Sequence, residues 1–396
     1  MKFVFYNPSR IVGGAEHLFF RLYSFYKNQG YDCKVVDYFD GAFFNLGVPP
    51  EDLISIGSIR QAFQVECDFF ILPPNMAYEA LYNVRMKDSV RIIFWSIHPY
   101  NCIPILPFAF YKRLDVSSLL KRVLDFSVLR KQIYYARALF KDASEKNALV
   151  FMDGENYSYA QSFIKLSVGK KLLPIPSPVI SYLKVAPEGA PSSLNFFWVG
   201  RLVDFKIGAL NRLIRDLDTW CQVQQVPVTL HVVGSGELEG HLLSATHFKI
   251  EKHGYLDNQT LHSKLATMAD AVFSMGTSVL ESAAIGVPSF IVMPTYETVG
   301  NEYSYMPLPE TQNFDLGSFS VIEGARRFEE LTMGKYFEGA YGATCRTYVL
   351  EHHDLAQIAA QLLVIAQDSS FFFSDVRPAY RKRFFSRFVF SVLKGK

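Results

Sequence analysis

The sequence has few of the features that mark a disulfide-bonded, membrane-spanning or nucleic-acid-binding chain. Its cysteines are odd in number and form no CxxC pair, which argues against a disulfide framework and against a cysteine zinc site. They lie at Cys33, Cys67, Cys102, Cys221 and Cys345. No segment offers about 18 uninterrupted apolar residues, so we expect no membrane-spanning helix. The net charge of +2 is too small to bind nucleic acid by bulk electrostatics. We expect a cytoplasmic protein.

Length and composition favour a globular chain of two domains. The chain has 396 residues, of which 49% are hydrophobic and 20% are charged, so each half is large enough to bury its own core. Residues 173–193 are rich in proline, glycine and serine, which is typical of a linker. We therefore predict a first domain over residues 1–178 and a second over residues 190–374.

The same order of strand, loop and helix opens each half. Residues 2–6 read as a strand, followed by a turn-rich loop and a helix over 15–28, and residues 194–199 with the helix from about 207 repeat this order. Further strands are predicted at 33–37, 69–72, 91–95, 148–152, 228–233, 271–273 and 289–292. Strands that alternate with helices predict an α/β chain of two Rossmann-like domains, with parallel sheets facing an interdomain cleft.

Two cations follow the first strand of the second half. The run FFWVGRLVDFK places Arg201 just after a strand and Lys206 near the start of the next helix. Ligands of open α/β sheets bind at the carboxyl ends of strands, and an Arg fork with a mobile Lys is suited to a diphosphate. The alternative is a solvated turn in which neither residue has a role.

Three other loops carry weaker signals. Gly14 stands with Gly13 just before a helix, where backbone amides can approach an anion, although such turns are also common in purely structural roles. Gly234 begins a GSG run that nearly matches a dinucleotide fingerprint, with its last glycine one residue late. His98 follows a predicted strand, where it could contact a sugar or phosphate or simply form a structural hydrogen bond.

The segment ADAVFSMGTSVLESAAIGVP carries the strongest of these signals. Gly276 precedes Thr277 and Ser278, either of which is expected to cap the following helix and leave its amides facing a ligand. Glu281, expected in the first turn of that helix, is an acceptor suited to the two hydroxyls of a ribose. The alternative is that Glu281 only complements the helix dipole.

Taken together, the motifs resemble those of retaining glycosyltransferases of the GT4 type. The shared elements occur in the family's order: GGAE at 13–16, VGRL with Lys206, VGSG at 233–236, GYLDNQTL at 254–261 and GTSVLESAAIGVP at 276–288. The resemblance implies a GT-B fold whose second domain binds a nucleotide-sugar and whose first domain binds the acceptor. It also implies that a C-terminal helix, residues 375–396, returns to the first domain.

The resemblance assigns roles residue by residue. Arg201 and Lys206 would hold the diphosphate, and His98 would lie beside the reacting sugar. Glu281 would bind the ribose, Gly14 a phosphate oxygen, and the segment 254–256 the base. The full set of implied donor-binding residues is Gly14, Gly234, Gly254, Tyr255, Leu256, Gly276, Thr277, Ser278 and Glu281.

One position departs from the family pattern. The family carries two glutamates eight residues apart, and eight residues before Glu281 this chain has Phe273. The first glutamate normally reaches the donor sugar, so its loss leaves that sugar open; amides at 275–277 or the Thr277 hydroxyl are the expected substitutes. It also keeps open a non-catalytic subunit that binds a nucleotide-sugar or a partner. A nucleotide-sugar epimerase is a further alternative, but it would need carboxylates that we do not identify.

The implied reaction needs neither a base carboxylate nor a metal ion. The leaving diphosphate itself would take the acceptor's proton, and the protein's cations would stabilise the growing charge. No His, Cys or carboxylate cluster has metal-ligand spacing along the sequence, so we expect no metal and no cofactor beyond a UDP- or GDP-sugar substrate. Asp216 and Asp218 resemble a DxD motif, but they lie in a helical pattern and are interpreted as surface charge.

Two segments suggest the nature of the acceptor. Basic and aromatic residues alternate over 108–146, a pattern typical of membrane surfaces, and again over 377–390. An amphipathic helix with a solvated basic face is the alternative for each. We expect a hexosyltransferase that acts on a glycan or lipid-linked glycan of a bacterial surface polysaccharide, with peripheral contact to an anionic membrane and no nucleic-acid partner.

Overall fold

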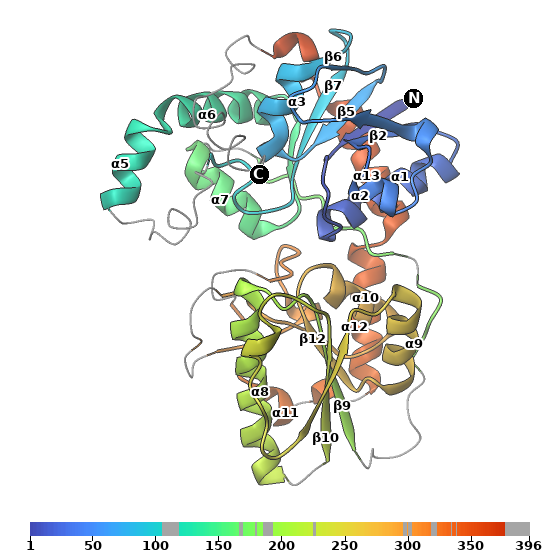
Figure 1. Cartoon of the computed structure of the whole chain (residues 1–396), viewed down its shortest axis with the longest axis vertical. Helices are drawn as coiled ribbons and strands as arrows, with labels where there is room; N and C mark the ends of the chain where they lie inside the picture. The colour runs from blue at the N-terminus through green and yellow to red at the C-terminus, as the bar shows by residue number, and fades with distance from the viewer. Residues whose placement is uncertain are drawn as a thin grey trace. The chain divides into compact units, whose positions relative to one another are not determined.

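The computed structural model divides the chain into two compact units. The described residues are 1–104, 119–165, 169–178, 180–184, 193–224, 227–295, 299, 303–317, 323–333, 335–337 and 339–376. The first unit comprises Met1–Pro174 and the described chain from Ala356 on, and the second comprises Ile175–Leu355 (Figure 1). The chain therefore passes from the first unit to the second after residue 174 and returns after residue 355. The predicted crossings were between residues 178 and 190 and after residue 374. The predicted helix over 375–396 lies almost wholly outside the described residues.

The first unit is built on a parallel sheet with the strand order β3-β2-β1-β5-β7-β8. The strands are β1 (Lys2–Tyr6), β2 (Asp32–Tyr38), β3 (Leu53–Ile56), β5 (Phe69–Leu72), β7 (Arg91–Ser96) and β8 (Leu149–Phe151). A separate pair joins β4 (Phe63–Gln64) to β6 (Val84–Arg85). Four of the five β1 residues are buried, because a central parallel strand is covered on both faces.

Helices cover this sheet, and one of them comes from the chain after the second unit. They are α1 (Gly14–Asn28), α2 (Ala42–Asn45), α3 (Ala77–Asn83), α5 (Leu119–Ser127), α6 (Arg130–Glu145), α7 (Gly154–Ile164) and α13 (Leu355–Asp368). Phe3 stacks on Tyr26 of α1 with ring centroids 4.4 Å apart. The Tyr26 hydroxyl donates to the Ala359 carbonyl of α13 at 2.7 Å, so the returning helix is packed onto the first unit.

The second unit repeats the plan with the strand order β11-β10-β9-β12-β13-β14. Its strands are β9 (Leu194–Val199), β10 (Val228–Val233), β11 (Lys249–Gly254), β12 (Ala271–Ser274), β13 (Ser289–Ile291) and β14 (Met306–Pro307). All neighbours pair in parallel except β14, which is antiparallel to β13. The predicted α/β fold with parallel sheets in two domains is confirmed.

Helices lie on both faces of the second sheet (Figure 1). They are α8 (Asp204–Gln224), α9 (Asn258–Met268), α10 (Thr277–Ile285), α11 (Phe328–Met333) and α12 (Gly339–His352). Short 3₁₀ turns in the chain are η1 (Pro50–Asp52), η2 (Pro74–Met76), η3 (Glu239–His241), η4 (Leu308–Glu310), η5 (Lys335–Phe337) and η6 (Phe373–Asp375). One core cluster contains residues of α8 and α11, and a second contains residues of α9 and α10.

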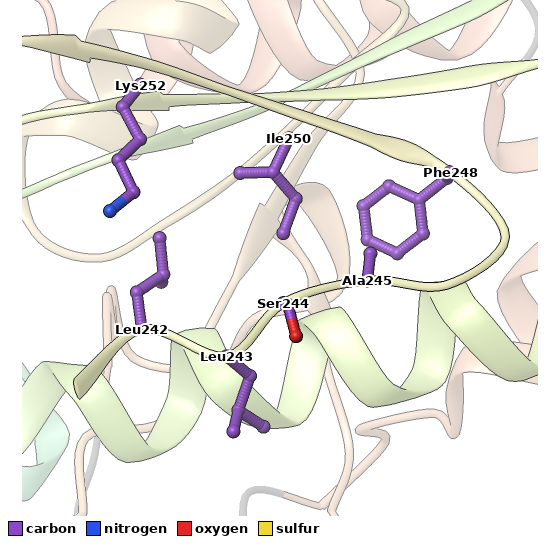
Figure 2. A pocket seen from close by; sticks show the side chains of 7 residues that line it. All are labelled: Leu242, Leu243, Ser244, Ala245, Phe248, Ile250 and Lys252. Atoms are coloured by element: carbon purple, nitrogen blue, oxygen red, sulfur yellow. The ribbon is translucent and has the colours of Figure 1, made fainter. Parts of the chain in front are cut away.

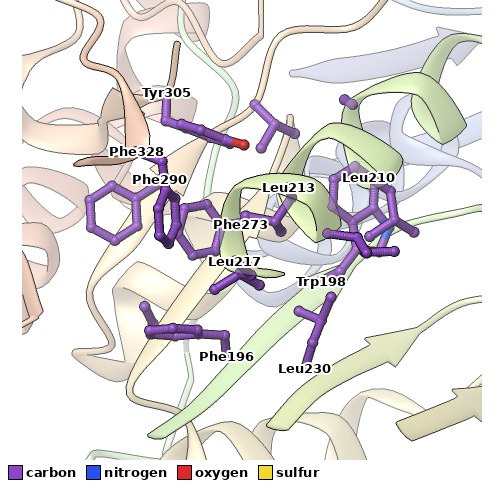
Figure 3. Close-up of a cluster of buried hydrophobic side chains, with 14 of the residues drawn as sticks. Phe196, Trp198, Leu210, Leu213, Leu217, Leu230, Phe273, Phe290, Tyr305 and Phe328 are labelled. Carbon is purple, nitrogen blue, oxygen red and sulfur yellow. The ribbon is translucent and has the colours of Figure 1, made fainter. Parts of the chain in front are cut away.

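Phe273 belongs to the core and not to a ligand-facing loop. It is fully buried, and its ring lies 5.0 Å from that of Phe290 and 5.4 Å from that of Tyr305. Figure 3 shows these rings packed together with Phe196 and Phe328. Because β12 ends at Ser274 and α10 begins at Thr277, the position eight residues before Glu281 falls inside the strand. A glutamate there would be a buried charge without a partner.

The interpretation of Asp216 as surface charge is wrong. Asp216 is 6% exposed, accepts the Tyr305 hydroxyl at 2.6 Å and pairs with Arg212 one helical turn earlier. Burial raises the pKa of Asp216. Asp218 accepts the backbone amides of Thr246 and His247, each at 2.7 Å. Both carboxylates therefore hold α8 to neighbouring segments.

Within the described ranges, no helix combines the length and the apolar character that crossing a bilayer requires.

Candidate functional site

The predicted loops of the second unit meet where the strand order reverses. β9 and β12 are neighbours, Val199 pairs with Ser274, and the Ser274 hydroxyl donates to the Val199 carbonyl at 2.6 Å. The chain therefore leaves both strands side by side, toward Arg201 in one loop and Gly276 in the other. This reversal point is where open α/β sheets bind their ligands.

Arg201 and Lys206 form a pair of cations at this point. Lys206 is the third residue of α8, and its side chain folds back so that a Cβ on Gly200 would lie 3.3 Å from Lys206 Nζ. Part of Lys206 stays exposed, but protein atoms enclose its ammonium. Burial, with the charge of Arg201 adding to it, lowers the pKa of Lys206 to about 8.

Neither cation pairs with a carboxylate among the residues that the structure describes. Two like charges held together, one of them largely desolvated, cost free energy until an anion binds. The folded-back side chain of Lys206 differs from the extended one that a solvated turn would leave in water, whereas Arg201 is exposed.

Glycines bring the loop after β9 against the loop after β10. Leu202 N donates to the Ser235 carbonyl at 3.0 Å. A Cβ on Gly234, whose φ is +132°, would lie 2.1 Å from the Gly200 carbonyl oxygen, and one on Gly236 would lie 2.2 Å from that of Leu202. The GSG run is therefore needed for close backbone approach, and it holds the Arg201 loop in place.

The predicted base-binding segment follows β11. Gly254 has a φ of +64°, and its carbonyl accepts the Gly234 amide at 2.7 Å, which joins a third loop to the first two. Tyr255 is 81% exposed, whereas Leu256 packs partly against the core cluster beneath α9. An exposed aromatic ring on a braced loop is suited to stacking on a base.

The start of α10 differs from the prediction in how it is capped. Gly276 is the N-cap residue and no side chain caps the helix, so Thr277 and Ser278 are its first two residues and not its caps. The φ of +64° at Gly276 explains the choice of glycine, and no atom lies within 4 Å of the position of an added Cβ. Amides without a side-chain cap, in a first turn without acidic residues, leave this helix end ready for an anion.

Glu281 was predicted in the first turn of α10, but it lies in the second turn. It is 9% exposed, and its Oε2 lies 3.4 Å from Nε2 of His262 on α9. Since it is outside the first turn, its carboxylate is poorly placed to complement the helix dipole. His262 was missed in the sequence because its 19-residue separation from Glu281 gives no local pattern.

The first unit presents a different edge. Gly14 is the exposed first residue of α1, and its N-cap, Gly13, has no side-chain cap. Glu16 occupies the first turn and accepts the Asn7 side-chain amide at 3.0 Å. The carboxylate of Glu16 therefore adds negative charge near the same helix end that Gly14 was predicted to offer to a phosphate.

Loops after β1 and β2 are tied together beside Gly14. Asp37 accepts the amides of Ser9 at 2.8 Å and Phe43 at 2.9 Å, and Ala42 N donates to the Ser9 carbonyl at 2.7 Å. Burial raises the pKa of Asp37. Large apolar side chains on these loops and on α2 are exposed, namely Ile11, Val12, Phe39 and Phe44.

His98 lies in the turn after β7 and is exposed. Its Nδ1 accepts the Tyr100 amide at 3.2 Å, and the Asn101 side chain accepts the Ile97 amide at 2.8 Å, which fixes the turn. The ring therefore has a defined orientation at the carboxyl end of the first sheet. His98 belongs to the first unit, and Arg201 and Lys206 belong to the second.

A pocket of about 330 Å³ lies elsewhere on the second unit. Figure 2 shows it between β11 and the loop that runs from Leu242 to Phe248. Its lining residues are Leu242, Leu243, Ser244, Ala245, Phe248, Ile250 and Lys252. They include no carboxylate and none of the residues of the strand-reversal point, so this pocket is separate from the predicted site.

Comparison with known proteins gives structural matches only. No family model matches the sequence, and no curated protein sequence matches it. A glycosyltransferase from Rickettsia africae is similar in structure at 11% identity and a TM-score of 0.53, over 93% of this chain and 98% of that one. WaaG, a glycosyltransferase involved in lipopolysaccharide biosynthesis, is similar at 13% identity and a TM-score of 0.53, over 92% and 99%.

A longer structure matches in part. The alignment with S. aureus TarM covers 75% of this chain but only 55% of TarM, at 13% identity and a TM-score of 0.46. The two matches over nearly the whole chain have TM-scores above 0.5 and support the two-domain α/β fold. The chain therefore has the GT-B fold, which it shares with solved glycosyltransferases.

Proposed function

We propose that the protein is a retaining glycosyltransferase of the GT4 type that transfers a sugar from a UDP- or GDP-sugar to a glycan acceptor. The observation that carries this proposal is the pair of Arg201 and Lys206 at the strand-reversal point, without a carboxylate partner among the described residues. A leaving diphosphate is the ligand that such a pair requires. Preorganised charges at a site of developing charge are a major source of catalysis.

In the proposed reaction, the bond between the anomeric carbon and the diphosphate oxygen breaks as the acceptor hydroxyl attacks from the same face. The hydroxyl proton passes to the leaving phosphate, so no base carboxylate is needed. Arg201 binds phosphate oxygens as a planar fork and Lys206 as a point charge. The amides at the start of α10 stabilise the same growing charge.

Donor recognition is assigned to the loops around this charge. Glu281 accepts the two ribose hydroxyls, and His262 at 3.4 Å holds its carboxylate in place. Tyr255 stacks on the base, beside Gly254 and Leu256. With Phe273 in the core, the sugar's own hydroxyls are bound by the amides of Gly276 and Thr277 or by the Thr277 and Ser278 side chains.

Acceptor recognition is assigned to the first unit. His98 provides a polar contact to the reacting sugar. The exposed apolar side chains on the loops after β1 and β2, described above, favour an acceptor with an apolar portion, such as a lipid-linked glycan. The fold shared with WaaG, whose pathway is lipopolysaccharide biosynthesis, supports a role in bacterial surface polysaccharide synthesis. We place the protein in the cytoplasm, in peripheral contact with the membrane.

A panel of nucleotide-sugars tests the proposal. We expect one of them to yield free nucleotide at a rate that rises with a glycan acceptor, and NMR of the product to show a retained anomeric configuration. The loss of the family's first glutamate favours one competing function, a non-catalytic binder. Saturable binding of a nucleotide-sugar without turnover against any acceptor would establish that competitor.

Chelation tests whether protein cations replace a catalytic metal. We expect turnover to survive EDTA and not to be stimulated by Mg²⁺ or Mn²⁺, because Arg201 and Lys206 occupy the role of the metal at the diphosphate. Loss of turnover in EDTA that Mg²⁺ restores would contradict this assignment.

A further inference from the structure

Three metal-ligating side chains meet on one face of the second sheet. His231 of β10 pairs in register with Glu251 of the edge strand β11. His253 follows at the irregularity where the register of the two strands shifts, and its ring lies beside that of His231. One ligand atom from each lies within 4.8 Å of the other two. Within the ranges that the structure describes, no other three such residues come together in this way.

The hydrogen bonds of His231 orient it as a ligand. His231 is 2% exposed, and its ring stacks on that of Phe197 with centroids 4.5 Å apart. Nε2 lies 3.1 Å from Asn195 Oδ1, and because that oxygen can only accept, Nε2 carries the proton. The unprotonated Nδ1 then points toward His253 Nε2 at 2.9 Å and Glu251 Oε2 at 3.4 Å. Metal-binding histidines are oriented in this way, with the second ring nitrogen donating to an oxygen.

We propose that His231, Glu251 and His253 bind one transition-metal ion of the Zn²⁺ class. Two imidazoles and a carboxylate suit Zn²⁺ better than Mg²⁺ or Ca²⁺, which prefer all-oxygen sites, and water would complete a tetrahedral shell. Zinc–nitrogen distances of about 2.0–2.1 Å separate two ligand nitrogens by about 3.3 Å. The imidazole nitrogens at 2.9 Å need only a small outward movement.

Two nearby lysines compete with a metal ion for this site, and the exposure of the ligands determines from which side the ion can enter. Lys249 pairs with Glu251 from a side chain that is 69% exposed, and Lys264 on α9 adds a second positive charge nearby. A metal ion must displace Lys249 into solvent, which its exposure allows. Glu251 and His253 are only partly buried, so the ion can enter from their side.

The role expected of the ion is structural. It would fasten the edge strand β11 to β10 immediately before Gly254, the residue that joins three loops of the proposed donor site. The opposite face of β11 carries Ile250 and Lys252, which line the separate pocket of Figure 2. The metal site is thus independent of that pocket, and its existence does not depend on sugar transfer.

Metal titration of the purified full-length chain tests the proposal without an activity assay. After removal of metal with a chelator, we expect one equivalent of Zn²⁺ to bind in competition with a chromophoric chelator. Co²⁺ in its place should give the intense visible absorption of a tetrahedral site. Zn²⁺ should also raise the melting temperature of the wild type.

Variants at the partly exposed ligands avoid a folding defect at buried His231. His253→Gln and Glu251→Gln should each weaken Zn²⁺ binding by more than about 10-fold and abolish the tetrahedral Co²⁺ spectrum. Asn195→Leu should weaken binding by about 10- to 100-fold, whereas Asn195→Asp, which keeps an oxygen acceptor, should restore it. His241→Gln, at an exposed histidine of the same unit, serves as the control.

Two results would overturn the proposal. One is Zn²⁺ uptake by the wild type no greater than that of His253→Gln. The other is one-equivalent binding that persists in both ligand variants while being lost in His241→Gln. Neither result bears on nucleotide release, so the metal site and the transferase proposal fail separately.

Discussion

The two units share a strand order but differ in charge where that order reverses. In the second unit, α10 begins without an acidic residue in its first turn. Arg201 and Lys206 follow the neighbouring strand β9, where α8 begins with Asp204. In the first unit, α1 begins with Glu16 in its first turn. The same topology thus provides two ligand edges, and the side chains decide their use. We propose that the second edge binds the anionic donor and that the first binds a neutral or apolar acceptor.

The largest expected effect comes from removing the cations of the second edge. We predict that Arg201→Ala and Lys206→Ala each lower turnover by about 100-fold or more, because each removes a preorganised charge from the leaving group. Nucleotide release from the preferred donor measures the loss. Arg215→Ala, at an exposed arginine of the same helix, should leave the rate unchanged. Wild-type rates in both site variants would contradict the proposal that the second edge differs from the first by stabilising a leaving diphosphate.

A smaller effect is expected at the ribose. Glu281→Ala should raise the KM for the nucleotide-sugar by about 10- to 100-fold, since a hydrogen bond to a charged group contributes roughly 1.5–3 kcal/mol. His262→Asn should raise KM by less, because it removes only the contact that positions Glu281. Steady-state kinetics separate these effects from kcat. A fall in kcat at unchanged KM in both variants would contradict a binding role.

The structure also predicts a stability cost for the enclosed cation. In the folded chain the pKa of Lys206 is about 8, below the ordinary value of 10.5. Below pH 8 the residue is charged in both states, so the penalty for enclosing it is fully present. As pH rises from 8 to 10.5, the folded state loses its proton first, and the penalty disappears.

Lys206→Met should therefore stabilise the free protein at pH 7 while inactivating it. We expect the free energy of unfolding to rise by on the order of 1 kcal/mol at pH 7 and the gain to shrink toward pH 10. Denaturant titrations at the two pH values measure this. A variant less stable than the wild type at pH 7 would show that the ammonium is well solvated in the free protein.

Much of the fold was predictable because parallel central strands are continuous apolar runs. The run FFWV of β9 is an example, with four buried residues in succession. β11 was not predicted, because its sequence KIEKHG belongs to an edge strand with exposed and half-buried residues. Because β11 was not predicted, the register that places His231 opposite Glu251 could not be predicted either. The cluster of three metal-ligating side chains was missed for the same reason.

The errors at the site have equally local causes. Thr277 and Ser278 are good capping residues by type, but the positive φ at the N-cap position requires Gly276 instead. Arg212 and Asp216 look like a surface pair one turn apart on a helix. Their burial depends on Tyr305, 89 residues away in sequence from Asp216. The positions of Arg201 and Lys206 were predictable from the strand end, but the enclosure of Lys206 depends on how its side chain folds back over Gly200.

The smallest expected effect concerns a membrane surface on the first unit. On α5, α6 and the turn between them, the exposed apolar side chains are Leu119, Leu120, Val123, Val128 and Tyr134. Arg130 and Lys131 are exposed beside them, whereas Phe108 and the basic residues up to 118 lie outside the described residues. Apolar side chains flanked by cations suit the interface of an anionic bilayer, where each cation contributes about 1 kcal/mol.

We therefore expect the protein to sediment with anionic vesicles more than with neutral ones, and to be released as salt rises. Arg130→Gln with Lys131→Gln should reduce recovery several-fold, and neutralising Lys121 and Arg122 as well should reduce it further. Lys141→Gln, at an exposed lysine near the other end of α6, is the matched control. Two results would contradict membrane binding by these helices. One is equal recovery with both vesicle types, and the other is recovery unaffected by all four neutral substitutions. The proposed acceptor would then be reached without membrane contact. The contrast between the two edges would rest on Arg201 and Lys206 in the second unit and on Glu16 and the exposed apolar side chains in the first.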